Sequence, residues 1–471
     1  MNRILRAGAA AAVLALSVSF GVGASQGVAH ADRPPPVNPA LLPPGDPARP
    51  PDKTEQKSNT PCVSTQQGGE GLATPAPQLA LDLPRAWEFS RGAGQLVAVI
   101  DTGVSRHPRL PDLDAGGDYV AEGGDGTSDC DGHGTVVAGI IGARPIADQG
   151  FSGVAPDARI LTIRQTSKVF QREGRSGEQR PEDQPDGYGD INALASAVRR
   201  AADWGATVIN ISLVLCTDGS YNPADGPLGA ALRYATLERN AVIVVAAGNK
   251  EQNCNAGNPG INPLNPSGDL WKNLSTNVTP ARYDDYVLTV GSIDRNGQPS
   301  AFSVPGPWVG VAAPGEDIVS LDARGTGTIT GFVNQQGGVT PLKGTSFAAP
   351  YVAGVVALVR ARFPELTPLE VIKRIQATAH APAEGWNPYV GYGAVDPVAA
   401  LTNEVPPTLP PKQPTSPRSI QLAVPAPAPP PDNRARNIAL VGSATVAILL
   451  TLGMLASFPI RRRFGVTGDD M

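Results

Sequence analysis

Five short runs of β-branched and other apolar residues constrain the fold of this chain more than any other feature of its sequence. They show no alternation of apolar and polar residues, so both faces of each run must be buried. Segments with helical periodicity lie between them, for example residues 191–205 and 228–240. This order predicts parallel strands joined by crossover helices, and hence a three-layer α/β domain with a mostly parallel central sheet. The five runs are residues 95–100, 158–163, 206–214, 241–247 and 286–293.

The predicted domain covers residues 81–405, and segments of different composition flank it. Residues 32–80 are rich in proline and have no periodic pattern, so we expect an extended arm. Residues 406–437 are denser in proline, which favours a stiff, extended linker. Within the domain, residues 168–190 are charged and contain glycine and proline, which predicts a mobile loop.

Two long apolar segments predict how the chain is placed at a membrane. The first follows Arg3 and Arg6, ends in a small-residue cleavage pattern, and predicts a signal peptide over residues 1–31. The second, residues 438–460, carries no charge. As a helix it reaches roughly 35 Å, enough for a hydrocarbon core of about 30 Å. Arginines begin residues 461–471, which favours a cytoplasmic tail. We therefore expect the domain to lie outside the cytoplasm, with a buried core helix as the alternative for the second segment.

The net charge and the cysteine content limit which partners and ligands we expect. The net charge is −5 and no basic run stands out in the domain, so nucleic acid is not an expected partner. Four cysteines follow the signal peptide, which suggests two disulfides in an oxidising location. Sequence alone leaves three pairings open, and no pair has the close spacing of a zinc site. The cysteines are Cys62, Cys130, Cys216 and Cys254.

Four polar residues lie where elements of the predicted domain begin or end. Asp101 directly follows a predicted strand, and Asn249 follows another. His133 and Ser346 stand at the start of two helical segments rich in small residues. Taken singly, each has an ordinary structural role in a turn or a helix cap. Since functional groups gather beyond the carboxyl ends of parallel strands, we expect the four side chains to lie together.

These four residue types suit nucleophilic catalysis. A serine at a helix N-terminus has an unpaired backbone N–H and lies at the positive end of the helix dipole, which would stabilise an anion formed beside it. His133 is the natural base, because Gly132 and Gly134 let other backbone approach it. The amide of Asn249 would donate a hydrogen bond to an oxyanion.

Several segments in this order resemble the signature segments of the subtilase family. They are VAVIDTGV, DGHGTVVAG, VINIS, AAGN and GTSFAAPYVAG, and they span residues 81–401. The order Asp, His, Ser is also that of subtilisin-type enzymes. The resemblance implies a subtilisin-like serine endopeptidase with Ser346 as nucleophile and His133 as general base and acid, with Asp101 orienting the imidazole. It also implies an oxyanion hole formed by Asn249 and the Ser346 N–H, and chemistry that needs no cofactor and no metal.

The order of segments along the whole chain resembles the mycosins, the membrane-anchored subtilases of type VII (ESX) secretion systems. The form TSDCD at residues 127–131 is close to the LSDCD that mycosins carry beside the histidine. The resemblance implies protein substrates, association with an ESX membrane complex, a membrane anchor, and a catalytic domain on the periplasmic side. It also implies that the arm wraps the domain. The implied disulfides are Cys62–Cys130 and Cys216–Cys254.

One departure from the subtilase pattern bears on substrate binding. Many subtilases have Ser-Leu-Gly after the VINI strand, where the glycine helps to open the pocket for the residue before the cut. This chain has Ser212, Leu213 and Val214 there. A valine should narrow that pocket, so we expect a preference for small residues.

Three alternatives remain beside this interpretation. The chain could act as a structural subunit of a secretion complex in which proteolysis is dispensable. The DTG at residues 101–103 could belong to an aspartic protease, but that chemistry needs two carboxylates and the chain holds no second copy of the motif. Asp112, Asp114 and Asp118 could bind calcium, although acidic residues in surface loops are usually only solvated.

Overall fold

The computed structural model describes residues 33–68, 71, 73–174, 187–218, 225–250, 254, 257–334, 336–412 and 432–463. The predicted signal peptide, most of the predicted linker and most of the predicted cytoplasmic tail lie outside the described residues. Contacts divide the chain into one unit up to residue 416 and a second one after it, and each is described by itself.

The core of the first unit is a parallel sheet. In the described part of the chain, seven strands lie in the order β12-β11-β9-β7-β3-β5-β4, and each pairs with its neighbours in parallel. The five predicted runs form β3, β5, β7, β9 and β11, so this prediction is confirmed. The two edge strands were not predicted. The strands are β3 (Leu96–Asp101), β4 (Leu113–Asp118), β5 (Arg159–Arg164), β7 (Val208–Ile211), β9 (Val242–Ala246), β11 (Val287–Ile293) and β12 (Val309–Pro314).

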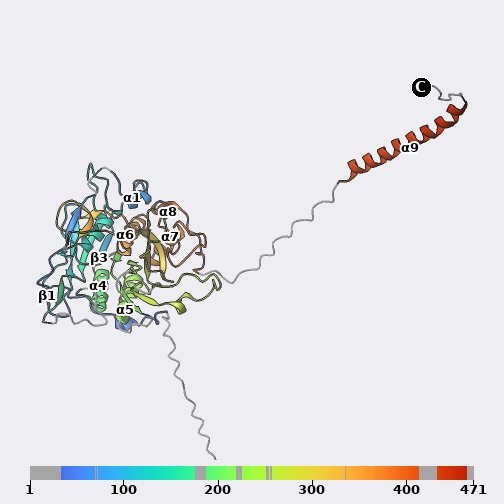
Figure 1. The fold of residues 1–471 in the computed structure, drawn as a ribbon. Helices are drawn as coiled ribbons and strands as arrows, with labels where there is room; N and C mark the ends of the chain where they lie inside the picture. Colours follow the sequence, from blue (N-terminus) through green and yellow to red (C-terminus); the bar gives the residue numbers. More distant parts are fainter. Residues whose placement is uncertain are drawn as a thin grey trace, which may run out of the picture. The chain divides into compact units, whose positions relative to one another are not determined.

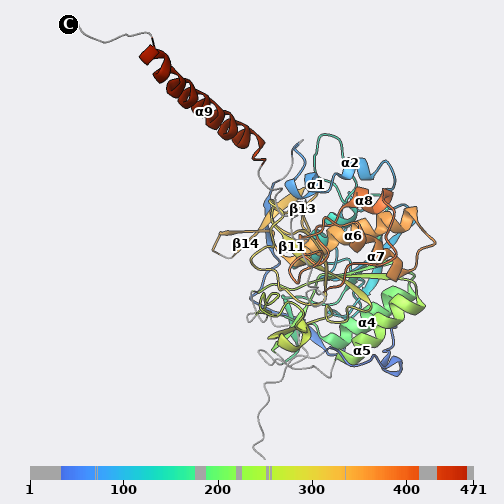
Figure 2. The same cartoon turned by 90° about the vertical axis from the view of Figure 1, so that its right-hand side faces the viewer.

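Helices cover both faces of this sheet, as Figures 1 and 2 show with α6, α7 and α8 on one side and α4 and α5 on the other. Along β3, Val97 and Val99 belong to the core on the α3 and α6 side, whereas Ala98 and Ile100 belong to the core on the α4 and α5 side. Because successive side chains point to opposite faces, each strand serves both cores. The three-layer α/β fold is therefore as predicted.

The helices follow the predicted pattern closely. Residues 191–205 contain α4, and residues 228–240 contain most of α5 followed by a π-helical turn, Tyr234–Glu238. Short 3-10 turns occur at Pro39–Leu41 and Leu270–Asn273. The helices of the first unit are α1 (Ala76–Ala80), α2 (Leu83–Ala86), α3 (His133–Gly142), α4 (Ile191–Asp203), α5 (Gly226–Arg233), α6 (Thr345–Arg362), α7 (Pro368–Ala377) and α8 (Pro397–Thr402).

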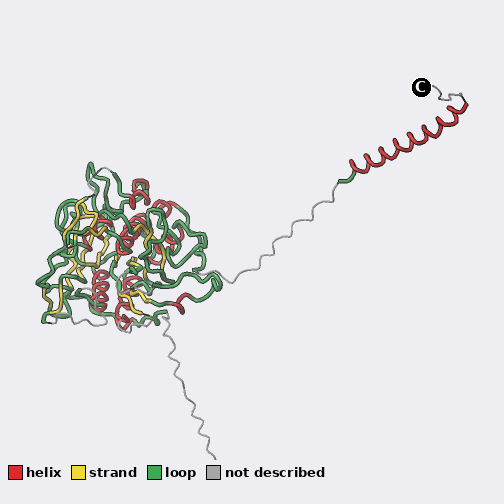
Figure 3. Tube along the Cα trace, viewed as in Figure 1, coloured by secondary structure: helices red, strands yellow, loops and turns green. Residues whose placement is uncertain are grey.

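The arm adds strands to the unit at two places far apart in sequence. Its β1 (Thr54–Gln56) pairs with β6 (Phe170–Arg172), and its β2 (Ser64–Gln67) pairs with β14 (Thr328–Val333). Part of the predicted loop 168–190 is thus a strand, and residues 175–186 lie outside the described residues. Helix α1 lies before residue 81, so helical structure begins inside the segment predicted as an extended arm. Loops fill much of the surface between these elements (Figure 3). The remaining strands are β8 (Leu215–Asp218), β10 (Thr276–Thr279), β13 (Ser320–Leu321) and β15 (Val339–Pro341).

Two disulfides join distant segments of the first unit, and they are the pairs that the resemblance implies. Cys62 of the arm is bonded to Cys130, three residues before His133. Cys216 on β8 is bonded to Cys254.

The second unit contains one long helix, α9 (Arg434–Arg463). Within it, Arg434–Ser457 is long and apolar enough to cross a membrane. The predicted apolar segment 438–460 lies inside this helix, which starts four residues earlier and runs on into the arginines.

Candidate active site

The fold brings Asp101 and His133 into direct contact. Asp101 ends β3 and His133 begins α3, and the Nδ1 atom of the imidazole lies 2.7 Å from Oδ1 of the carboxylate. The Asp101 side chain is fully buried, whereas 23% of the His133 side chain is exposed. The backbone N–H of Thr102 donates a second hydrogen bond to the same oxygen at 2.8 Å. The carboxylate is therefore held in place while the imidazole faces solvent on its other side.

The contact with Asp101 favours the protonated form of the His133 imidazole. Burial acts to lower the pKa of His133, but the charge and the hydrogen bond of Asp101 outweigh it, so the pKa is raised above its ordinary value. Because Asp101 accepts at Nδ1, the neutral ring carries its proton there and leaves Nε2 as an acceptor. That arrangement suits a general base.

Gly134 explains how α3 comes so close to the end of β3. A Cβ atom added to Gly134 would overlap the backbone carbonyl oxygen of Gly103 and would lie 3.1 Å from Cβ of Asp101. The backbone of the first turn of α3 therefore packs directly against the backbone of the turn after β3. At position 134 only glycine fits without a shift of one of the two segments.

Ser346 lies in the first turn of α6, a helix that is apolar almost all round and is buried from Thr345 to Arg360. The Ser346 side chain is almost fully buried. The next residue, Phe347, packs its ring against the His133 ring, with 5.0 Å between ring centroids. The start of α6 is therefore in contact with the start of α3.

Asn249, which follows β9, lies on the other side of Ser346. Its Oδ1 atom accepts hydrogen bonds from the backbone N–H of Thr345 at 3.0 Å and from the Thr345 hydroxyl at 3.1 Å. These bonds fix the amide, so Nδ2 is the atom left to donate. A Cβ atom added to Gly344 would lie 3.1 Å from Ser346 Oγ and 3.3 Å from Asn249 Nδ2. The hydroxyl and the amide thus border one small volume.

Of the three residues that follow β7, Ser212 forms a hydrogen bond with Ser346. The Ser212 hydroxyl donates to the backbone carbonyl of Ser346 at 2.7 Å and accepts from the Asn210 side chain at 2.9 Å. Leu213 and Val214 are half-buried, and Val214 packs against the cores on both faces of the sheet. Asp101 and His133 are thus in direct contact, whereas Ser346 is connected to His133 through its neighbour Phe347 and to Asn249 through its neighbour Thr345.

Some residues of this site were not predicted. Thr345 orients the Asn249 amide, and Asp129 bonds to the segments that carry Asp101 and His133. The sequence marks these two residues only by their closeness to predicted catalytic residues: Thr345 precedes Ser346, and Asp129 lies four residues before His133.

The three acidic residues considered for calcium face arginines instead. Asp112 pairs with Arg144, Asp114 with Arg159 and Asp118 with Arg164. Among the residues that the structure describes, no group of three or more His, Cys, Asp or Glu side chains has an arrangement that could hold a metal ion.

Comparison with known proteins identifies the class of this fold and site. Residues 92–393 match the model of the subtilase family. This match covers more than half of the chain, which therefore belongs to the subtilase family of serine peptidases.

Within this family, the chain is similar to mycosins over most of its length. Mycosin-4 of Mycobacterium tuberculosis is 46% identical over 462 residues, which cover 97% of each chain. The crystal structure of MycP1 from the ESX-1 type VII secretion system matches with a TM-score of 0.74 at 46% identity, covering 80% of this chain and 97% of that one. A chain of an intact ESX-5 inner membrane complex matches with a TM-score of 0.74 at 42% identity, covering 90% of this chain and 99% of that one. The protein is thus a serine endopeptidase of the mycosin type.

Proposed function

We propose that this endopeptidase cuts peptide bonds with Ser346 as its nucleophile and His133 as its general base. Nε2 of His133 takes the hydroxyl proton while Oγ attacks the carbonyl carbon, and the imidazolium then returns that proton to the leaving amine. Water hydrolyses the resulting acyl-enzyme by the same route. The observation that carries the proposal is the 2.7 Å contact between Asp101 and Nδ1, because it fixes the tautomer that leaves Nε2 free to accept.

The oxyanion of the tetrahedral intermediate is stabilised by Nδ2 of Asn249 and the backbone N–H of Ser346. The support is the fixed amide, whose Oδ1 is already bound by Thr345, and the shared volume beside Gly344. The positive end of the α6 dipole adds to this stabilisation. Removing such a donor typically costs about 3 to 4 kcal/mol in transition-state binding.

Fluorophosphonate labelling of the detergent-solubilised full-length protein tests the nucleophile and the base together. We expect labelling of the wild-type protein, none of Ser346→Ala, and much slower labelling of His133→Ala. His380→Ala is the matched control, since His380 is exposed and pairs with Asp396 away from this site. Labelling that persists in folded Ser346→Ala, or an unlabelled folded wild-type protein, would contradict the assignment.

Substrate preference follows from the residue that replaces the usual glycine. Val214 places an isopropyl group where many subtilases have glycine, beside the pocket for the side chain that precedes the cut, so small residues are preferred there. A peptide library should show cuts after alanine, glycine or serine. The Val214→Gly variant should accept phenylalanine or tyrosine at that position. Efficient cleavage after these aromatic residues by the wild-type protein would refute this preference.

The cellular setting is a membrane anchor with the peptidase domain on the periplasmic side, in association with an ESX secretion complex. Support comes from α9, which is long and apolar enough to span a bilayer, and from the match to a chain of the ESX-5 inner membrane complex. The arginines at the end of α9 favour a cytoplasmic tail. Protease added to intact spheroplasts should degrade the domain and spare the tail. Degradation of the tail with the domain spared would contradict this topology.

The same match favours a second, structural role in the complex. Two strains separate these roles. In the first the gene for this chain is deleted, and in the second the deletion is complemented with the Ser346→Ala variant. Secretion restored by the inactive variant would assign the secretion phenotype to the structural role, whereas secretion lost in both strains would assign it to proteolysis.

A further inference from the structure

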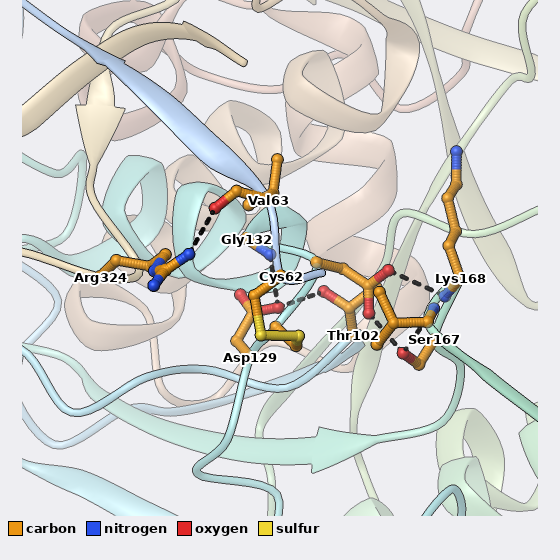
Figure 4. Close-up of a disulfide and its surroundings, with 11 residues drawn as sticks. Cys62, Val63, Thr102, Asp129, Gly132, Ser167, Lys168 and Arg324 are labelled. Carbon is orange, nitrogen blue, oxygen red and sulfur yellow. Dashed lines mark hydrogen bonds between the residues drawn. A yellow bond between two sulfur atoms is a disulfide. The ribbon is translucent and has the colours of Figure 1, made fainter. Parts of the chain in front are cut away.

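Asp129 carries a buried carboxylate that the mechanism above does not use. Its Oδ1 atom accepts hydrogen bonds from the Thr102 hydroxyl and from the Gly132 backbone N–H, both at 2.8 Å. Its Oδ2 atom accepts from the backbone N–H of Thr135 at 2.8 Å and from the Thr135 hydroxyl at 2.6 Å. Figure 4 shows Asp129 between Thr102 and Gly132.

Two of these partners, Thr102 and Gly132, are adjacent in sequence to a residue of the proposed catalytic pair, and Thr135 lies two residues after His133. Thr102 follows Asp101 and donates its backbone N–H to the Asp101 carboxylate. The Thr102 hydroxyl also accepts from the backbone N–H of Gly134 at 2.9 Å. Gly132 precedes His133 and Gly134 follows it. Hydrogen bonds through Asp129 and Thr102 thus form a closed network between the end of β3 and the start of α3, beside the direct bond from Asp101 to His133.

The loop that carries Asp129 is also held from its outer side. Cys130 is bonded to Cys62 of the arm, and its carbonyl accepts from the Val63 backbone N–H at 2.9 Å. Asp131 accepts from the Ser167 hydroxyl at 2.5 Å and from the Lys168 backbone N–H at 2.8 Å (Figure 4). With both neighbours fixed, a change at Asp129 acts on the start of α3 rather than on the loop.

Charge adds a second link between Asp129 and the histidine. Burial raises the pKa of Asp129 to about 7, and its hydrogen bonds act against that rise. The charged groups that act on His133 are Asp101 and Asp129, which raise its pKa, and Lys168, which lowers it. Asp131 in turn raises the pKa of Asp129. An ionised Asp129 at the N-terminus of α3 is also favoured by the helix dipole.

We propose that Asp129 is a positioning residue of the active site, whose carboxylate holds the start of α3 against the end of β3 and so sets the placement of His133. The proposal rests on the assignment of His133 as the general base.

Steady-state kinetics of the full-length protein in detergent test this role, with a chromogenic tetrapeptide anilide ending in alanine as substrate. In Asp129→Asn, the amide NH2 faces N–H and O–H donors that need an acceptor, so the network loosens. We expect kcat to fall about 10- to 100-fold with KM within about twofold of wild type. Asp125→Asn is the matched control, because Asp125 lies in the same loop and is exposed, and its carboxylate accepts hydrogen bonds from Thr127 and not from a residue next to the catalytic pair. Its kinetic constants should be those of wild type.

The pH dependence of kcat/KM separates positioning from simple loss of stability. If the start of α3 moves away from Asp101, the charge and hydrogen bond that raise the pKa of His133 weaken, so the acid limb of Asp129→Asn should move to lower pH. If Asp129 had only a structural role, its loss would lower the fraction of protein molecules with a reactive serine, which fluorophosphonate titration counts. The acid limb of the remaining active molecules would then stay in place. An unchanged acid limb together with an unchanged kcat per active site would overturn the proposal.

Two variants of Thr102 keep the test informative if Asp129→Asn does not fold. Thr102→Ser retains the hydroxyl and should keep most of kcat. Thr102→Val removes the link from Asp129 to Gly134 and should lose about tenfold in kcat with KM unchanged. Equal kcat values in the two variants would overturn the proposal. A wild-type profile with no acid limb would instead contradict the assignment of His133 itself, so the two failures are distinguishable.

Discussion

Replacing Gly134 by alanine should inactivate the enzyme without unfolding it. The added Cβ atom would overlap the Gly103 carbonyl oxygen and lie 3.1 Å from Cβ of Asp101. Asp101 ends a buried strand and Gly103 lies in the turn after it, so neither atom can yield as the end of a flexible side chain could. The start of α3 must therefore retreat by roughly 1 Å to reach van der Waals contact.

The size of the effect follows from where that retreat occurs. His133 is the residue before Gly134, so the 2.7 Å contact between Nδ1 and the Asp101 carboxylate lengthens as the helix moves. A misplacement of about 1 Å at a catalytic group costs on the order of 10²-fold in rate, or about 2.7 kcal/mol of barrier. Alanine has a higher helix propensity than glycine by about 1 kcal/mol, which offsets part of the strain in the folded state.

The assay is kcat on the alanine anilide, with circular dichroism and thermal unfolding as checks on folding. Gly142→Ala is the matched control on the same helix, because its added Cβ atom would lie 3.1 and 3.3 Å from the flexible Ile160 side chain and at an ordinary contact distance of 3.8 Å from the Ala155 carbonyl oxygen. We expect Gly142→Ala to retain activity within a few-fold. A folded Gly134→Ala protein with kcat within threefold of wild type would refute the reasoning.

Three further predictions concern other parts of the molecule. Activity should be lost as pH falls through the raised pKa of His133, so the acid limb of kcat/KM should have a midpoint above the usual value of about 6.5, and a midpoint below it would be inconsistent with the Asp101 contact. The double variant Cys62→Ser/Cys130→Ser should lose about 4 kcal/mol of stability in denaturant unfolding, because the bond closes a loop of 68 residues, whereas a loss under 1 kcal/mol would mean that the arm stays docked without it. Thr345→Val should lower kcat about tenfold, well short of the 10²- to 10³-fold loss expected for Asn249→Ala, and equal losses in the two variants would argue against an orienting role for Thr345.

The five central strands could be predicted from the sequence, whereas the edge strand β4 could not. β9 reads VIVVA, and such a run has few options other than the middle of a parallel sheet. β4 reads LDAGGD and contains no β-branched residue, so only its pairing with β5 makes it a strand. The arm strands, TEQ and STQQ, are polar and depend in the same way on partners far along the chain.

The candidate site shows the same division. Asp101, His133, Asn249 and Ser346 could be selected because each stands at the end of a recognisable element. Asp129 and Thr345 could not, because their importance lies in hydrogen bonds that exist only once β3, α3 and α6 are packed together.

The pairing of the arm also fixes an order of events during folding. Thr54 pairs with Arg172 and Gln67 with Ile329, so residues made first wait for strands made much later. Closing such long loops costs only slightly more than closing short ones, but it cannot begin before the partner exists. The two ladders of the arm therefore close one after the other, because β1 needs only β6, whereas β2 must wait for β14, which is made after all seven described strands of the central sheet.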